Sequence, residues 1–224
     1  MIRGAPFGRR FERATLSAFQ VTRFNKDAFE ACQKLASGQV DGVVLTGPVG
    51  VGKTHLLVGL AKSYVESRSS RELEPPDSDL VEIPDVSELM EQVRRDGSEE
   101  AGPPELEPFE SRPEAVVEFW PMLDLASELR AEVMQGELAL SRRCRICDLL
   151  VLDDLGQEKL TDFILQEFQR IIDWRYRERK HIAVATNRTV REIVERYGEN
   201  ITSRWQESCV IAEIKGPDYR TERS

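Results

Sequence analysis

Histidine and cysteine, the residues that bind most transition metals, are scarce in this chain, with two histidines and four cysteines in 224 residues. Cys144 and Cys147 have C-x-x-C spacing, but a zinc site needs a second pair of ligands nearby. The histidines do not supply one, because His55 lies in a glycine-rich loop and His181 begins a predicted strand. We therefore interpret all four cysteines as reduced thiols, and a redox role for the C-x-x-C pair remains the alternative.

Long hydrophobic runs are also missing. No stretch of the sequence approaches the roughly 20 consecutive apolar residues that a membrane helix needs. The first six residues, Met1 to Pro6, contain no apolar segment of the kind found in signal peptides. We therefore expect a cytoplasmic protein with no membrane partner.

The net charge of −9 is concentrated in one segment. Residues 66–114 hold 16 of the acidic and 5 of the basic residues, together with 7 of the 11 prolines. We interpret this segment as an acidic, mostly irregular insert, with one amphipathic helix at 85–93. Because the rest of the chain is slightly basic, the overall acidity does not exclude binding to a phosphate backbone.

Outside the insert, predicted strands and helices alternate. Short apolar runs predict strands at 43–46, 116–120, 149–153, 181–186 and 209–213. Helical spacing predicts helices at about 26–37, 53–65, 123–133 and 162–179, with Thr161 as the N-cap of the last. This alternation predicts an α/β fold with a parallel sheet covered on both faces.

The assignment of the second strand is ambiguous, because 81–94 and 116–130 both read as a strand followed by a helix ending in arginine. We prefer 116–130, since its strand is more apolar and lies nearer the third strand. The chain then divides into an arm and helix at 1–40, a domain at 41–220 interrupted by the insert, and a tail at 221–224.

A glycine-rich loop between the first predicted strand and the following helix fits the pattern G-x-x-x-x-G-K-[ST] in full. It consists of Gly47, Pro48, Val49, Gly50, Val51, Gly52, Lys53 and Thr54. The backbone N–H groups of such a loop point inward at phosphate, and the helix dipole favours the same negative charge. We expect Lys53 to reach the β and γ phosphates of ATP and the Thr54 hydroxyl to bind Mg²⁺.

Two acidic residues end the third predicted strand. Asp153 and Asp154 follow four apolar residues, so a buried strand delivers carboxylates to the edge of the sheet where ligands bind. We expect Asp153 to hold Mg²⁺ through water and Asp154 to orient or deprotonate an attacking water. A solvated acidic turn is the alternative, and the phosphate-binding loop upstream disfavours it.

Three further polar residues are candidates for catalysis. Asn187 ends the fourth predicted strand and could bond to the γ-phosphate and the lytic water, although asparagine is also common in turns. Arg204 and Arg220 are candidates for stabilising charge on a transferring phosphoryl group. A surface salt bridge is the more common role for any single arginine.

Taken together and in this order, these motifs resemble the helicase-loader branch of the AAA+ ATPases, the DnaC/DnaI/IstB-like family, over about residues 11–220. Three runs of sequence carry the resemblance: the entry motif from Phe11 to Leu16 with Phe19 and Phe24-Asn25, the Walker A loop with its trailing His55, and the run 148–156 with its Walker B acids. Single residues add to it: Asn187 matches sensor 1, Arg204 lies in the arginine-finger region, and Arg220, within 216–220, is a sensor 2 candidate.

The resemblance implies a three-layer αβα P-loop NTPase with a five-stranded parallel sheet, and an ATPase that uses ATP and Mg²⁺. It implies a homo-oligomer in which Arg204 of one subunit points at the ATP of the next. It also implies partners: single-stranded DNA, with a replicative helicase for loaders or a transposase for IstB-like helpers. Residues 123–130 and the arginines at 142, 143 and 145 are the DNA-facing candidates, and a solvated basic turn is the alternative for the arginines.

Two departures from the family pattern keep another function open. Only about 40 residues precede the first strand, too few for the separate helicase-gripping domain that loaders usually carry. The acidic insert is either a solvated linker, which we favour, or a docking arm. An ATP-controlled protein adaptor that does not bind DNA is therefore the alternative function.

Overall fold

The computed structural model describes residues 1–4, 8–71, 115–135 and 139–219. The helix predicted at 85–93 and the alternative strand at 81–94 lie outside these ranges. The described residues up to 69 and from 115 onward belong to one compact unit, and the architecture given below is that of this unit.

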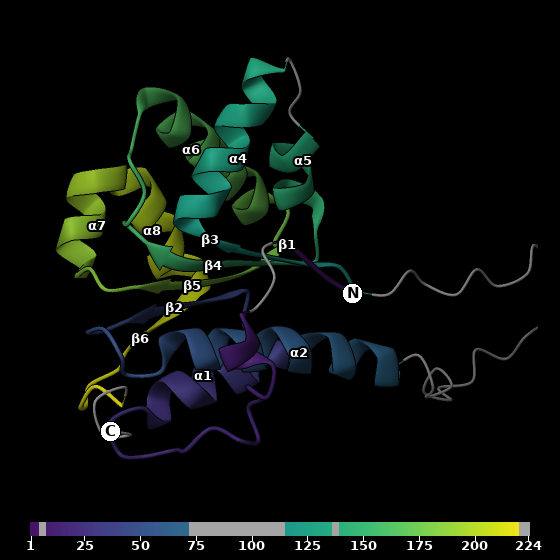
Figure 1. Ribbon diagram of the computed structural model, residues 1–224, viewed down its shortest axis with the longest axis vertical. Helices are drawn as coiled ribbons and strands as arrows, with labels where there is room; N and C mark the ends of the chain where they lie inside the picture. Colours follow the sequence, from purple (N-terminus) through teal and green to yellow (C-terminus); the bar gives the residue numbers. More distant parts are fainter. Residues whose placement is uncertain (5–7, 72–114, 136–138, 220–224) are drawn as a thin grey trace, which may run out of the picture. The chain divides into compact units, whose positions relative to one another are not determined.

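The described residues form one parallel sheet in the order β1-β3-β4-β5-β2-β6 (Figure 1). Its strands are β1 (Ile2–Gly4), β2 (Gly42–Thr46), β3 (Val117–Pro121), β4 (Leu149–Leu155), β5 (His181–Thr186) and β6 (Cys209–Glu213). The predicted α/β class with a parallel sheet is confirmed, but the sheet has six strands rather than five. The additional strand, β1, pairs with β3 at the sheet edge and is too short, at three residues, to give a periodic signal.

The five predicted strands all form. Segment 116–130 supplies the strand beside β4, where Val117 pairs with Leu149, as preferred from the sequence. Strand β2 lies between β5 and β6, and its last residue, Thr46, pairs with Thr186 and Glu213. Because all strands are parallel, the segments that follow β2, β4 and β5 leave the sheet at the same edge.

Helices cover both faces of the sheet. They are α1 (Lys26–Ala36), α2 (Lys53–Arg71), α4 (Met122–Met134), α5 (Ala139–Ile146), α6 (Asp162–Arg177), α7 (Val190–Tyr197) and α8 (Glu199–Ser208), with a short 3-10 helix η1 (Arg9–Phe11). Helices α1 and α2 lie on one face and α4 to α8 on the other (Figure 1). The buried apolar residues accordingly form two clusters, one on each side of the sheet. None of the described helices has the length and apolarity needed to cross a bilayer.

Helix α6 agrees with its prediction. The Thr161 hydroxyl caps it by accepting a hydrogen bond from the Ile164 backbone N–H, and its apolar face is buried. Helix α2, in contrast, continues to Arg71 rather than ending near Val65. Its last turns lack apolar residues, and polar contacts hold them: the Ser67 hydroxyl donates to the carbonyl of Ala36, and the Arg68 guanidinium lies over the Tyr64 ring.

Helix α4 forms as predicted, but two residues predicted to lie on its buried apolar face are exposed. Leu123 and Val133 are 53% and 41% exposed. The buried face consists of Met122, Leu125, Ala126 and Leu129. Both sets fit helical spacing, and they differ in phase because the helix begins directly after Pro121 at the end of β3.

Candidate nucleotide-binding site

The loop between β2 and α2 has a backbone that requires glycine. Gly47 and Gly50 have φ values of 141° and 83°. A Cβ atom on Gly47 would lie 2.3 Å from the carbonyl oxygen of Ile214, and one on Gly50 would lie 1.7 Å from an Asp218 carboxylate oxygen. The glycines of the predicted phosphate-binding loop are therefore needed both for its backbone conformation and for its packing.

Lys53 opens α2 and is only 5% exposed. Its Nζ donates hydrogen bonds to the carbonyl oxygens of Gly47 and Pro48, at 2.7 and 2.6 Å, and to Oδ1 of Asn187 at 2.5 Å. The loop and the end of β5 thus meet through one ammonium group. Lys53 and Asn187 come together although they are far apart in the sequence.

The two acidic residues of β4 occupy different environments. Asp153 is 5% exposed and hydrogen-bonded to the Thr54 side chain. Burial, followed by the charge of Asp154, raises the pKa of Asp153 to about 6. Asp154 has a φ of 52°, beside a register shift between β4 and β5, and its side chain is exposed. The backbone irregularity therefore directs neighbouring carboxylates to different places, one toward Thr54 and one into the adjoining cavity.

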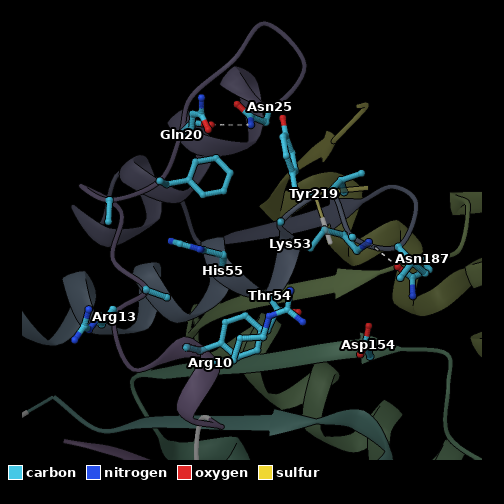
Figure 2. A pocket seen from close by; sticks show the side chains of 18 of the residues that line it. Arg10, Arg13, Gln20, Asn25, Lys53, Thr54, His55, Asp154, Asn187 and Tyr219 are labelled. Carbon is cyan, nitrogen blue, oxygen red and sulfur yellow. Dashed lines mark hydrogen bonds between the residues drawn. The ribbon is translucent and has the colours of Figure 1, made fainter. Parts of the chain in front are cut away.

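A cavity of about 900 Å³ adjoins these groups (Figure 2). Its walls come from three parts of the chain: the N-terminal arm, the phosphate-binding loop with the start of α2, and the segments that follow β4, β5 and β6. The arm supplies Arg10, Phe11, Arg13, Ala14, Ala18, Phe19, Gln20 and Asn25; the loop and α2 supply residues 49–55, including His55; and the remaining residues are Asp154, Gln157, Asn187 and Tyr219.

The contribution of the arm is the part of the site that the motifs did not predict. The arm is fixed to α2 by Lys62, whose Nζ donates to the carbonyl oxygens of Glu12 and Ala14 at 2.7 and 2.9 Å. The Phe19 ring packs edge-on against His55, with ring centroids 5.4 Å apart. Gly59 was a possible signal in the sequence, because a glycine inside a predicted helix costs about 1 kcal/mol relative to alanine, and in the structure it admits the backbone of Thr15 and Leu16.

A second group that the sequence analysis missed supports the Walker B turn. The buried Glu158 carboxylate accepts hydrogen bonds from the Gly156 backbone N–H at 2.9 Å and from the Tyr197 hydroxyl at 2.5 Å. It also forms an ion pair with Arg196 at 3.0 Å. These contacts hold the turn after Asp154 against α7.

The predicted catalytic arginines lie elsewhere or outside the described ranges. Arg204, on α8, does not line the cavity; its guanidinium pairs with Asp173 of α6 at 2.5 Å. Arg220 is outside the described residues. The structure therefore brings together the loop, both acidic residues and Asn187, but not Arg204.

The C-x-x-C pair and the arginine cluster belong to α5 and its end, whereas Cys32 lies on α1 and Cys209 begins β6. All four cysteines are free thiols, and burial raises the pKa of Cys144 and Cys147 above the usual range. Among the described residues, no group of three or more histidine, cysteine or acidic side chains is arranged to hold a metal ion. Arg142 is exposed, whereas Arg143 forms a 2.9 Å ion pair with the buried Glu118.

The residues of this site fit Mg²⁺ and a nucleoside triphosphate. The glycine-rich loop, the buried ammonium of Lys53 and the nearby Asn187 are suited to phosphate. The Thr54 hydroxyl and the Asp153 carboxylate are oxygen ligands, which Mg²⁺ prefers. Asp154 lines the cavity, where it could orient a water.

Comparison with known proteins gives a fold but no sequence family. No protein-family model matches the chain, and no curated protein does. A crystal structure of the DnaC helicase loader superposes with a TM-score of 0.66 at 22% identity, over 93% of this chain and 100% of that chain. DnaI superposes at 0.60 and 18% identity, over 97% and 96%.

The replication initiator DnaA bound to AMPPCP and single-stranded DNA superposes with a TM-score of 0.62 at 19% identity. The match covers 92% of this chain and 51% of that chain, so this chain spans about half the length of that DnaA. These similarities show that the protein has an AAA+-like α/β fold, and they confirm at the structural level the predicted resemblance to helicase loaders.

Proposed function

We propose that this protein is an ATPase of the AAA+ type that binds ATP with Mg²⁺ and hydrolyses it slowly to switch an assembly on single-stranded DNA. The setting would be DNA replication initiation, with a replicative helicase as the partner, or a related process with a transposase as the partner. Arg204 of one copy would act on the ATP of a neighbouring copy in a homo-oligomer.

One arrangement carries the proposal: Lys53, Thr54, the two acidic residues of β4 and Asn187 meet at one edge of the sheet, beside a cavity of about 900 Å³. In this arrangement Lys53 binds the β and γ phosphates and Thr54 binds Mg²⁺, with Asp153 behind it. Asp154 and Asn187 then orient the attacking water. Similarity in fold to DnaC, DnaI and DnaA supports the biological setting.

Nucleotide binding tests the core of the proposal. Lys53→Ala should weaken ATP binding by roughly 10- to 100-fold, because a hydrogen bond to a charged group contributes about 1.5–3 kcal/mol. Lys34→Ala is a matched control, since Lys34 is exposed on α1 and does not line the cavity. Equal ATP affinities for the two variants, measured by calorimetry, would exclude the site.

Hydrolysis in the assembled state tests the role of Arg204. Arg204→Ala should keep ATP binding, because the residue does not line the cavity of its own subunit. It should lose DNA-stimulated turnover, because Arg204 is proposed to act on the ATP of a neighbouring copy. Wild-type turnover of this variant in the presence of DNA would show that the arginine-finger assignment is wrong.

A specific observation also favours the adaptor as a second candidate. Within the arginine cluster proposed to face DNA, Arg143 is neutralised by the buried Glu118, and Arg142 is the exposed member. Fluorescence anisotropy with labelled single-stranded DNA separates the two functions. ATP-dependent, salt-sensitive binding supports the DNA function, and no binding at low salt supports the adaptor.

The partner can be identified by capture from host lysate with the Asp154→Asn variant in ATP. This variant should hold ATP while hydrolysing it slowly. The positive φ of residue 154 also suits asparagine, which tolerates the left-handed region. Recovery of a replicative helicase would indicate a loader, and recovery of a transposase would indicate a transposition helper.

A further inference from the structure

Arg10 belongs to η1 in the N-terminal arm, and its side chain lines the nucleotide cavity. Figure 2 places it toward the same end of the cavity as Thr54 and Asp154, away from Gln20 and Asn25. Thr54 and Asp154 mark the end where the metal and the terminal phosphate would lie, so in this view Arg10 is on the phosphate side of the cavity.

Arg10 is an exposed cation without a partner among the residues that the structure describes. Arg13, which also lines the cavity, likewise has no partner among these residues, whereas Arg188 is paired with Glu192 and Arg196 with Glu158. Such pairing limits the reach of a guanidinium, because breaking it costs free energy. The Arg10 guanidinium needs no such exchange to bind an incoming anion.

The backbone that carries Arg10 is held in place. The N–H of Phe11 donates to the Gly8 carbonyl oxygen at 2.8 Å, and the N–H of Ala14 donates to the Phe11 carbonyl oxygen at 3.0 Å. Ala14 is buried in the core cluster beneath the arm, and Lys62 binds the carbonyl oxygens that follow η1. A cation on a fixed backbone loses less freedom on binding than one on a mobile chain.

The charge of the cavity also points to an anionic ligand. Its ionised lining residues are three cations, Arg10, Arg13 and Lys53, and one carboxylate, Asp154. A triphosphate with one Mg²⁺ remains negatively charged, so Lys53 alone does not balance it. The arm supplies the additional positive charge from a part of the chain outside the phosphate-binding loop.

We propose that Arg10 binds the terminal phosphate of ATP in its own subunit, so that the N-terminal arm distinguishes ATP from ADP. This inference rests on the proposed function, because it assigns a further residue to the same site. A planar guanidinium suits the purpose, since it donates two parallel hydrogen bonds to phosphate oxygens.

The test compares Mg²⁺-dependent binding of ATP and ADP by calorimetry in four proteins: wild type, Arg10→Ala, Arg13→Ala and Arg9→Ala. Arg9 is the matched control, because it is the exposed neighbour in η1 and does not line the cavity. We expect Arg10→Ala to lose about tenfold in ATP affinity while ADP affinity changes less than about twofold. Arg9→Ala should bind both nucleotides as the wild type does.

Three results would overturn the inference: an unchanged ratio of ATP to ADP affinity in Arg10→Ala, an equal loss for both nucleotides, or an ATP-specific loss in Arg13→Ala alone. If the wild type binds ATP in a Lys53-dependent manner and Arg10→Ala keeps the ratio, only this inference fails. If the wild type binds neither nucleotide, the proposed function fails and the inference fails with it. Thermal melting of each variant verifies that the proteins compared are folded.

Discussion

The arm packs closely on α2 at Gly59, and replacing this residue with alanine tests whether the arm forms a wall of the nucleotide site. A Cβ atom at this position would lie 2.7 Å from the backbone nitrogen of Leu16 and 2.8 Å from the carbonyl carbon of Thr15. Both are main-chain atoms, so a side-chain rotation does not relieve the contact. The arm has to move away from α2.

The required movement follows from these distances. Comfortable contact between such atoms begins near about 3.5 Å, so the arm shifts by roughly 1 Å. Alanine gains about 1 kcal/mol of helix propensity over glycine, while overpacking costs about 1–3 kcal/mol, so global stability should fall by no more than about 2 kcal/mol. The arm lining, including Phe19, moves with its backbone, and we expect ATP affinity to fall by about tenfold.

Calorimetric titration with ATP and thermal melting measure the two effects separately. Ser63→Ala, one turn further along α2, controls for a change in helix propensity. If Gly59→Ala bound ATP with the wild-type dissociation constant, the arm would not form a wall of the site, and the inference about Arg10 would lose its structural basis.

Two further predictions concern stability. Glu158→Ala should lower the free energy of unfolding by about 3 kcal/mol, because it leaves Arg196 and Tyr197 without their buried acceptor. Thermal melting should record a fall in Tm of roughly 6–12 °C, and a fall of less than about 2 °C would show that the Walker B turn does not depend on Glu158. Burial, with a contribution from Arg68, lowers the pKa of His181 from 6.5 to about 4. As the pH falls from about 6.5 to about 4, the unfolded chain therefore takes up a proton that the folded chain does not, and stability declines in that window. His181→Asn should remove this part of the pH dependence, and identical urea-denaturation profiles for variant and wild type across that window would contradict the assignment.

The phosphate-binding loop and the Walker B strand were predictable because each is a run of neighbouring residues whose chemistry and flanking elements can be read directly. The arm was not, because its place in the site depends on contacts between distant segments. Lys62 holds the carbonyl oxygens of Glu12 and Ala14, and Gly59 admits the backbone of Thr15. Of these, only the glycine inside a helix is visible as a signal in the sequence.

The arginine cluster of α5 shows a different limit of sequence reasoning. Three arginines within four positions suggested a basic surface, but Arg143 forms an ion pair with the buried Glu118. The Glu118 carboxylate also accepts a hydrogen bond from the Trp120 indole. A carboxylate in the interior requires such partners. The sequence does not show which arginine pairs with Glu118, because Glu118 lies on a separate element, strand β3.

The strand order has a consequence for how the molecule folds. Strands β3, β4 and β5 follow one another in the chain and pair with one another in the sheet. Two helices, α4 and α5, connect β3 to β4, and one helix, α6, connects β4 to β5. Strand β2, which carries the phosphate-binding loop, lies between β5 and β6, and both of these come much later in the chain. Closing so long a loop is slow and entropically costly, so we expect the block from β3 to β5 to form early and β2 to dock late. Nucleotide-binding competence would then be among the last properties that the chain acquires, and ATP would stabilise the completed fold over every partly folded state.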